Sequence, residues 1–115
     1  MNSCELIICA WNKGHTWNFS SQKEMHNFIE SPICMGSERL KNPLHPTQKP
    51  IKVLERIIRI ATKPGDVIFD PFMGVGSTGV AAMNLRRQFI GFELEQQYYD
   101  AAIKRLDAAI QSKLI

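Results

Sequence analysis

The sequence predicts an α/β fold, a mostly parallel sheet with flanking helices, on the basis of three observations. Two short apolar runs, at residues 67–69 and 89–92, are typical of buried strands in a parallel sheet. Amphipathic helical patterns alternate with these runs, and a glycine-rich turn directly follows the first run. The chain has 115 residues, of which 44% are apolar and 22% charged, so it can form one domain at most.

The first 44 residues predict little regular structure. An apolar run predicts a strand at Glu5–Trp11, and Thr16–Phe19 is a shorter extended stretch that could pair with it. Residues 20–44 are polar and interrupted by Pro, Gly and Ser, so a long irregular loop is expected there. Loops of that length are uncommon in compact domains and usually have a function or are disordered.

From residue 45 onward the pattern becomes regular and predicts a βαβα unit. Apolar side chains after Pro50 fall on one helical face as far as Ala61, and the turn Lys63–Asp66 ends this helix. The remaining expected elements are a strand at residues 67–69, a helix at about 77–85, a strand at 89–92 and a helix at about 96–111. Parallel strands joined through a helix are expected to have a right-handed crossover.

The segment most indicative of chemistry is the turn between the first strand and its helix. Gly74, Gly76 and Gly79 satisfy the G-x-G-x-x-G nucleotide-binding pattern between a strand and a helix. Glu93 ends the next strand, at a suitable distance to bind ribose hydroxyls. A tight strand-to-helix turn without a ligand is the plain alternative.

The charges around this turn favour a cationic ligand over a dinucleotide. A pyrophosphate would bind at the helix N-terminus, but Asp70 stands at the mouth of the turn and would repel it. No Lys or Arg lies between Pro71 and Leu85. S-adenosylmethionine has a cationic methionyl end and a ribose that Glu93 could hold, and it has no phosphate. The charges therefore favour S-adenosylmethionine over NAD.

Two neighbouring motifs resemble those of the β-class DNA amino-methyltransferases, which modify adenine N6 or cytosine N4. Residues 70–78 read Asp-Pro-Phe-x-Gly-x-Gly-Ser-Thr, and residues 45–50, one helix earlier, read His-Pro-Thr-Gln-Lys-Pro. The resemblance covers about residues 38–110. Thr16–Phe19 and Gly36–Leu40 also look like stretches that those enzymes carry upstream.

The resemblance implies a partial Rossmann-like methyltransferase fold, S-adenosylmethionine as cofactor and DNA as partner. In such a site Thr47 and Lys49 would close over the methionyl end, where the following helix also begins. For these two residues the plain alternative is a proline-bounded start of a helix with a solvated lysine. The cofactor-binding residues that we predict are Thr47, Lys49, Asp70, Pro71, Phe72, Gly74, Gly76, Ser77, Thr78 and Glu93.

The motif with which that family performs its chemistry, Asp/Asn/Ser-Pro-Pro-aromatic, is absent. None of the six prolines is adjacent to another. In the family this motif orients the target amine, and its aromatic residue stacks on the flipped base. We therefore predict no catalytic residue, and we expect an inactive, cofactor-binding C-terminal part of a longer DNA methyltransferase.

The resemblance also implies an incomplete domain. Residues 1–44 would hold one or two strands and a remnant of the target-recognition region, and residues 45–115 would hold the S-adenosylmethionine-binding part. In this arrangement residues 1–20 and 66–93 supply two edges of a sheet whose central strands are missing. Since bare edges and an uncovered apolar face are costly, a complementing N-terminal half or a second copy of the chain is expected to supply the rest.

Contacts with DNA are predicted for Lys13, Trp17, Arg39 and Lys41. The net charge of +3 permits an anionic partner without requiring one. The plain alternatives are the buried face of a short strand for Trp17 and solvated surface for the basic residues. Two other functions stay open: a non-catalytic S-adenosylmethionine-binding or interaction module that needs a partner chain, and an NAD-binding oxidoreductase fragment.

Several other classes of protein are excluded by composition. The longest apolar run, Leu6–Trp11, has six residues, whereas a membrane span needs about 20. The three cysteines form no metal-binding pair or disulfide pattern, and no signal peptide is recognisable, so a cytoplasmic protein is expected. His26 and His45 lack the neighbours that a zinc site requires.

Overall fold

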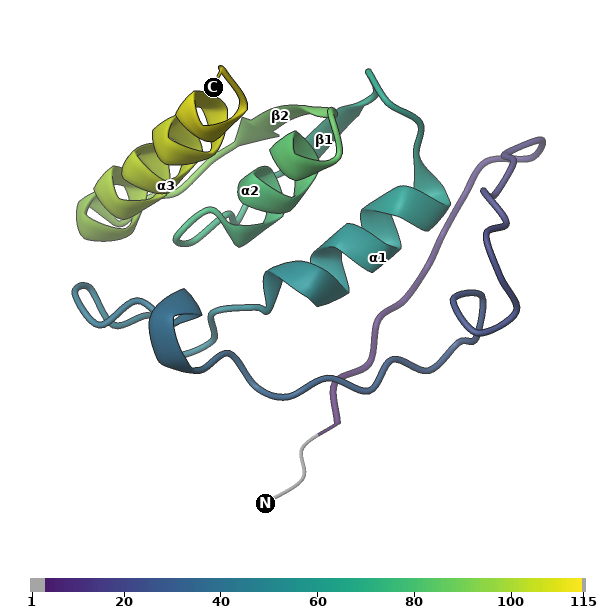
Figure 1. Cartoon of the computed structure of the whole chain (residues 1–115), viewed down its shortest axis with the longest axis horizontal. Coiled ribbons are helices and arrows are strands. Elements are labelled where there is room, and N and C mark those ends of the chain that lie inside the picture. Colours follow the sequence, from purple (N-terminus) through teal and green to yellow (C-terminus); the bar gives the residue numbers. More distant parts are fainter. Residues whose placement is uncertain (1–3, 115) are drawn as a thin grey trace.

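The computed structural model describes residues 4–114, in which α2 lies between α1 and α3 and two strands lie behind it (Figure 1). The elements in chain order are the 3₁₀ turn η1 (Gly36–Glu38), α1 (Ile51–Ala61), β1 (Val67–Asp70), α2 (Ser77–Asn84), β2 (Gln88–Gly91) and α3 (Gln96–Leu114). Residues 1–3 and 115, at the ends of the two predicted segments, lie outside the described residues. None of the described helices is both long and apolar enough to cross a membrane.

The two strands pair in parallel, as predicted, and one face of their sheet forms the core. Ile68 lies opposite Phe89, and both side chains point toward the helices because side chains alternate along a strand. There they pack against a cluster formed by Ile58, Ala81 and Ala82. The core therefore lies between one face of the sheet and α2, with Ile58 of α1 packed at its side.

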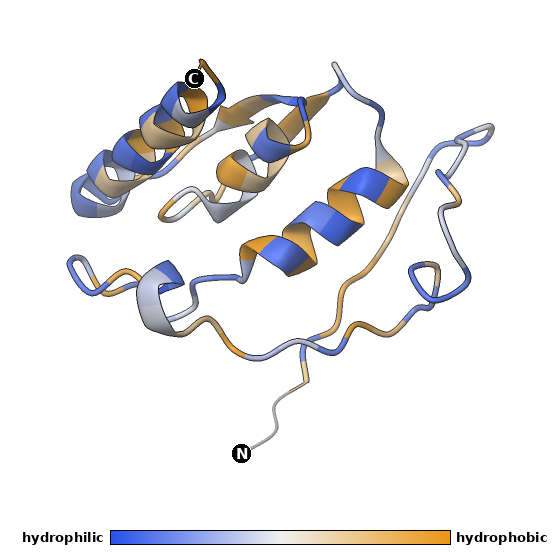
Figure 2. Cartoon of the chain, in the orientation of Figure 1, coloured by the Kyte–Doolittle hydropathy of each residue, from blue (hydrophilic) through white to orange (hydrophobic). Residues whose placement is uncertain are grey.

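The other face of the sheet is apolar and uncovered. Val67 is 53% exposed, Phe69 60%, Ile90 50% and Phe92, just after β2, 60%. The rings of Phe69 and Phe92 contact each other edge to face, with their centroids 5.9 Å apart. Within residues 4–114 no third strand pairs with β1 or β2, so both edges are open. The expected bare edges and uncovered apolar face are confirmed; Figure 2 shows the apolar residues along the strands.

The strand predicted at Glu5–Trp11 is wrong, and Thr16–Phe19 forms no strand either. Residues 5–11 are extended but unpaired, with Leu6 92% and Ile8 93% exposed. Residues 5–11 run beside α1 (Figure 1), so their backbone groups find no neighbouring strand. Residues 4–20, the described part of the predicted segment 1–20, therefore do not supply an edge of the sheet.

The predicted helices form, with small differences at their ends. α1 begins directly after Pro50 and ends at Ala61, as predicted. α2 ends at Asn84, one residue before the predicted end. α3 continues to Leu114, because the sequence after Gln111 contains no Gly or Pro that would stop it and Lys113 complements the dipole of the last turn.

The described residues before the 45–50 motif, residues 4–44, are called the arm. Polar contacts from this arm hold both ends of α1. Asn18 donates its backbone N–H to the carbonyl of Ile60 at 2.8 Å, and its side-chain amide binds the carbonyls of Arg59 and Thr62. At the other end the Glu38 carboxylate accepts the N–H of Ile51 at 2.7 Å. These contacts satisfy backbone groups that a helix leaves unpaired at its ends.

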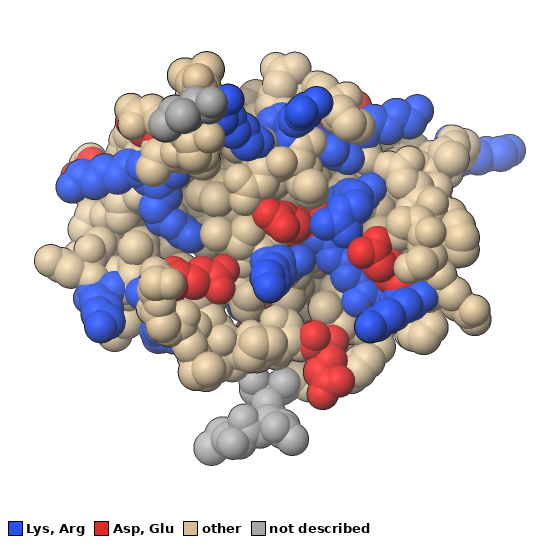
Figure 3. All heavy atoms as spheres, in the orientation of Figure 1, with Lys and Arg blue, Asp and Glu red and all other residues tan. Residues whose placement is uncertain are grey.

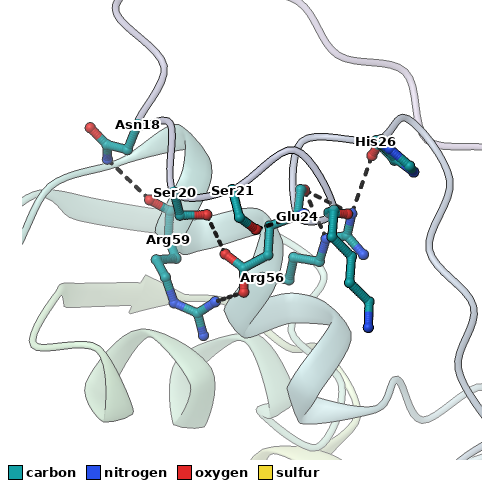
Figure 4. A network of polar contacts seen from close by, with 8 residues as sticks. Asn18, Ser20, Ser21, Glu24, His26, Arg56 and Arg59 are labelled. Atoms are coloured by element: carbon teal, nitrogen blue, oxygen red, sulfur yellow. Dashed lines mark hydrogen bonds and ion pairs between the residues drawn. The ribbon is translucent and has the colours of Figure 1, made fainter.

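Two arginines, one in the middle of α1 and one in its last turn, bind the arm (Figure 4). Arg56 donates to the backbone carbonyls of Lys23, Glu24 and His26, at 2.7 to 3.3 Å. Arg59 pairs with the Glu24 carboxylate at 3.1 Å, and the hydroxyl of Ser20 donates to the same carboxylate. Residues 20–44 therefore form the irregular loop predicted, with the short turn η1 as the exception, and side-chain contacts fasten it to α1.

The substitution Glu24→Gln tests this attachment. The hydrogen bond from Ser20, with the charges of Arg59 and Arg56, holds the pKa of Glu24 below its ordinary value of 4.5. A lowered pKa stabilises the folded state above the unfolded-state value and loses that effect as the pH falls through the folded-state value. In urea unfolding, the wild-type chain should therefore be more stable than Glu24→Gln at pH 7, and this difference should shrink below about pH 4.5. A difference that is constant from pH 7 to pH 3 would contradict the assignment.

Candidate functional site

The glycine turn after β1 is closed by backbone and side-chain contacts from the segment after β2. The N–H of Met73 donates to the carbonyl of Phe92 at 3.0 Å, and the N–H of Gly74 donates to Oε2 of Glu93 at 3.0 Å. The second oxygen of the Glu93 carboxylate accepts the N–H of Glu95 at 2.8 Å. Glu93 therefore ties the turn to the start of α3.

Asp70 and Glu93 lie at the same end of the sheet, where both strands have their carboxyl ends. Asp70 is the last residue of β1, opposite Gly91 in the register, and Glu93 follows β2 by two residues. One oxygen of the Asp70 carboxylate accepts the N–H of Phe72 at 3.0 Å, and the Phe72 side chain is 88% exposed. Ligands of open α/β sheets bind outside the carboxyl ends of the strands, which is where these side chains lie.

The backbone conformation and close neighbours of the turn require glycine at positions 74 and 76, with or without a ligand. Gly76 has a φ of +82°, and a Cβ there would lie 3.0 Å from the Cβ of Ala102 in α3. Gly74 has a φ of +54°, and a Cβ there would lie 2.9 Å from Nε2 of His45. The turn therefore needs glycine for its backbone and its neighbours, so the ligand hypothesis rests on the carboxylates rather than on the glycines.

The segment at residues 45–50 is held against the turn mainly by His45. Its ring lies beside Gly74 and contacts the ring of Tyr98 edge to face, with a centroid distance of 4.7 Å. The buried side chain of Gln48 donates to the carbonyl of Glu38 at 2.6 Å and accepts the N–H of Leu40 at 2.9 Å. The two motifs of the sequence are thus neighbours in space.

Thr47 and Lys49, predicted to close over the methionyl end, are both exposed. Lys49 forms an ion pair with Glu5, with N–O distances of 2.7 and 2.8 Å. The first amide of α1, at Ile51, already binds the carboxylate of Glu38. The Lys49 ammonium and the first amide of α1, both expected to hold a ligand carboxylate, therefore have partners within the chain in this structure.

The sequence prediction missed two residues that contact the turn, His45 and Arg105, and one that fixes the neighbouring motif, Gln48. Arg105 in α3 donates to the carbonyl of Val75 at 2.7 Å and to Oγ of Ser77 at 3.1 Å. The sequence from 71 to 85 contains no cation, but the fold brings one to the turn. No periodicity or motif signals a contact between residues 30 positions apart, so only the tertiary structure reveals it.

The four predicted DNA contacts fall into two separate groups. Lys13 and Trp17 are near the C-terminal end of α1, where the Trp17 ring contacts Trp11 and His15 edge to face. Arg39 and Lys41 flank Leu40, which binds Gln48 near the N-terminal end of α1. An 11-residue helix is about 16 Å long, which separates the groups by about that length.

The hollows of the surface and its charges do not single out a further ligand site. Two open hollows are lined by Gly14, His15 and Ala61, at the amino ends of the strands and away from Asp70. Figure 3 shows Lys and Arg scattered over one face with acidic side chains among them. Within residues 4–114 no group of three or more His, Cys, Asp or Glu side chains could hold a metal ion.

Comparison with known proteins identifies the family. The sequence model of a family described as DNA methylase, N6_N4_Mtase, matches residues 9–104. Type II methyltransferase M2.DpnII of Streptococcus pneumoniae is 58% identical over 93% of this chain, and Type II methyltransferase M.HinfI of Haemophilus influenzae is 40% identical over 85%. The chain spans only 43% and 30% of the length of these two relatives.

Solved structures show the same relationship. The crystal structure of an M1.HpyAVI–SAM complex matches 83% of this chain and 46% of its own, with a TM-score of 0.65 and 42% identity. The PvuII DNA methyltransferase, described as cytosine-N4-specific, matches 58% of this chain and 26% of its own, with a TM-score of 0.51 and 31% identity. The fold is thus a partial Rossmann-like methyltransferase fold, and the chain belongs to the DNA methylase family.

Proposed function

We propose that this chain binds S-adenosylmethionine at the glycine turn and forms the cofactor-binding part of a DNA N-methyltransferase. The observation that carries this proposal is the position of two carboxylates, Asp70 and Glu93, on either side of the turn at the carboxyl edge of the sheet. A relative with 42% identity was solved in complex with SAM, which supports the same ligand here.

Each carboxylate suits one end of that ligand. Asp70 attracts the cationic methionyl end. Glu93 uses one hydrogen bond on each oxygen, while a carboxylate has about four acceptor positions, so it can still accept ribose hydroxyls. The exposed Phe72 ring offers an apolar surface beside them. Pro71, Gly74 and Gly76 belong to the same turn, and Ser77 and Thr78 begin α2 directly after it.

Thr47 and Lys49 act on the carboxylate of the methionyl group in this proposal. Lys49 has to leave Glu5, and the cost is small because both side chains are exposed, at 46% and 68%. Exposed ion pairs contribute less than about 1 kcal/mol. His45 keeps the segment against the turn, so both residues start close to the proposed site.

When bound, the sulfonium supplies a methyl group for in-line transfer to an exocyclic amine of a base in DNA. The chain's own residues position the donor and match its charge, which are the main sources of rate acceleration in such a transfer. The Pro-Pro motif that would orient the amine is absent from this sequence. We therefore propose that the chain by itself binds the cofactor without methylating DNA.

Calorimetric titration with S-adenosylmethionine tests the cofactor site. Asp70→Asn keeps an acceptor for the Phe72 N–H but removes the charge, so we expect binding at least about tenfold weaker than in the wild type. Asp70→Ala should weaken it at least as much.

Asp66→Asn is the matched control. Asp66 also accepts a backbone N–H, from Lys63 at 2.9 Å, but it precedes β1 at the opposite end of the strand. This variant should bind like the wild type. Equal heats for wild type and Asp70→Asn, or no binding by the wild type, would refute the assignment.

We also propose that the uncovered sheet face is completed by the remainder of a DNA methylase. The apolar face formed by Val67, Phe69, Ile90 and Phe92 and the open edge of β1 are what a further parallel strand with its covering helices would bury. The chain spans less than half of its curated relatives, so those relatives contain enough additional sequence to do so.

Co-expression with the part of M2.DpnII that lies outside the match tests this partnership. The two parts should co-purify and together methylate DNA, while this chain alone should not. Phe69→Ser, on the uncovered face, should abolish co-purification. Phe19→Ser, which changes an even more exposed phenylalanine of the arm, should not. A homodimer of the chain that excludes the added part would instead favour a second copy as partner.

A non-catalytic S-adenosylmethionine-binding module is the second candidate function. The absent Pro-Pro motif favours it for the isolated chain. It predicts cofactor binding without methyl transfer even in the presence of the added part, so the same co-expression experiment separates the two functions.

A further inference from the structure

Arg105, in the middle of α3, fastens the glycine turn from behind. Its Nη1 atom donates to the carbonyl of Val75 at 2.7 Å and to the hydroxyl of Ser77 at 3.1 Å. Both of these residues are buried, and they flank Gly76, where the turn becomes helix α2. One guanidinium thus binds a backbone carbonyl before Gly76, whose φ is +82°, and a side-chain hydroxyl after it.

The neighbouring turn of α3 contacts the same point. The Cβ of Ala102 lies where a side chain of Gly76 would have to be. Ala102 and Arg105 are three positions apart and therefore lie on one face of α3. The glycine turn therefore packs against Ala102 of α3 and is hydrogen-bonded to Arg105 of the same helix.

The guanidinium of Arg105 lies at the N-terminus of α2, which carries partial positive charge and disfavours a cation. Other contacts must therefore stabilise the guanidinium there. Burial lowers the pKa of Arg105, while the nearby Glu38 and Cys34 raise it. Both of these groups come from the arm upstream of α1. The guanidinium is therefore kept at the turn by two acceptors in the turn and by an acidic neighbour in the arm.

Glu38 also belongs to the contacts that fix the motif at residues 45–50. Its carboxylate accepts the N–H of Ile51, and its carbonyl accepts the side-chain amide of Gln48. Glu38 thus links the arm to the motif and lies near the guanidinium of Arg105, which bonds α3 to the turn.

We propose that Arg105 is a positioning residue that holds the glycine turn in its ligand-binding shape before the ligand arrives. It acts through the carbonyl of Val75 and the hydroxyl of Ser77 and does not touch the ligand. The inference rests on the proposed function of the turn, and its test therefore includes a measurement that needs no ligand.

Amide hydrogen exchange of the chain provides that measurement. Arg105→Met removes the donors at similar side-chain length, so the amides of Gly74 and Gly76 should exchange about tenfold faster than in the wild type, since a bond from a charged donor is lost. The amides of β2 should keep their rates. Arg105→Lys retains the charge with a single donor centre and should give an intermediate rate.

Arg56→Met is the matched control, because Arg56 is also a helix arginine that donates to backbone carbonyls, but in the arm. It should leave exchange at the turn unchanged. Unchanged exchange at Gly74 and Gly76 in Arg105→Met, or equal acceleration in the turn and in β2, would overturn the proposal.

Titration with S-adenosylmethionine separates this inference from the proposed function. Arg105→Met should raise Kd about tenfold and Arg56→Met should leave it unchanged. Equal Kd values for wild type and Arg105→Met overturn the positioning role while the proposed function stands. A wild-type chain that does not bind S-adenosylmethionine overturns the proposed function, whatever the exchange rates show.

Discussion

The parallel pairing of β1 with β2 is the constraint on which the candidate site depends. The register puts Asp70 opposite Gly91, so both strands deliver a carboxylate to the same edge of the sheet. Glu93 then binds the amide of Gly74 and closes the turn over that edge. A shift of one residue in this register would turn the side chains of one strand to the other face and take the two carboxylates apart.

The arm before α1 is attached to that helix by hydrogen bonds between side chains and backbone groups, not by strand pairing. The arm before α1 forms no strand, yet Asn18 and Glu38 cap the two ends of the helix and Arg56 binds three carbonyls of the arm. A helix of 11 residues is marginal by itself, so its stability comes from these caps and from its packing on α2. The motif at residues 45–50 thereby reaches the glycine turn.

The predictions from sequence succeeded where local patterns sufficed and failed where a strand needed a partner. The helices and strands after Pro50 follow from local periodicity, turn residues and helix stops, and they form nearly as predicted. The strand at Glu5–Trp11 has the same local pattern but does not form, because a strand needs a neighbour to bond with and none lies beside it in residues 4–114. An apolar run predicts which residues could be buried and not whether a partner strand is present.

The amino-acid sequence by itself determined the βαβα order, the family and the pair of carboxylates after the strands, because each is encoded in neighbouring residues. Only the tertiary structure decided that Arg105 reaches the glycine turn, that His45 rather than Thr47 or Lys49 contacts it, and that the basic residues of the arm lie in two groups. These are contacts between residues far apart in the chain. They depend on how the helices pack, and no local pattern of side chains records that packing.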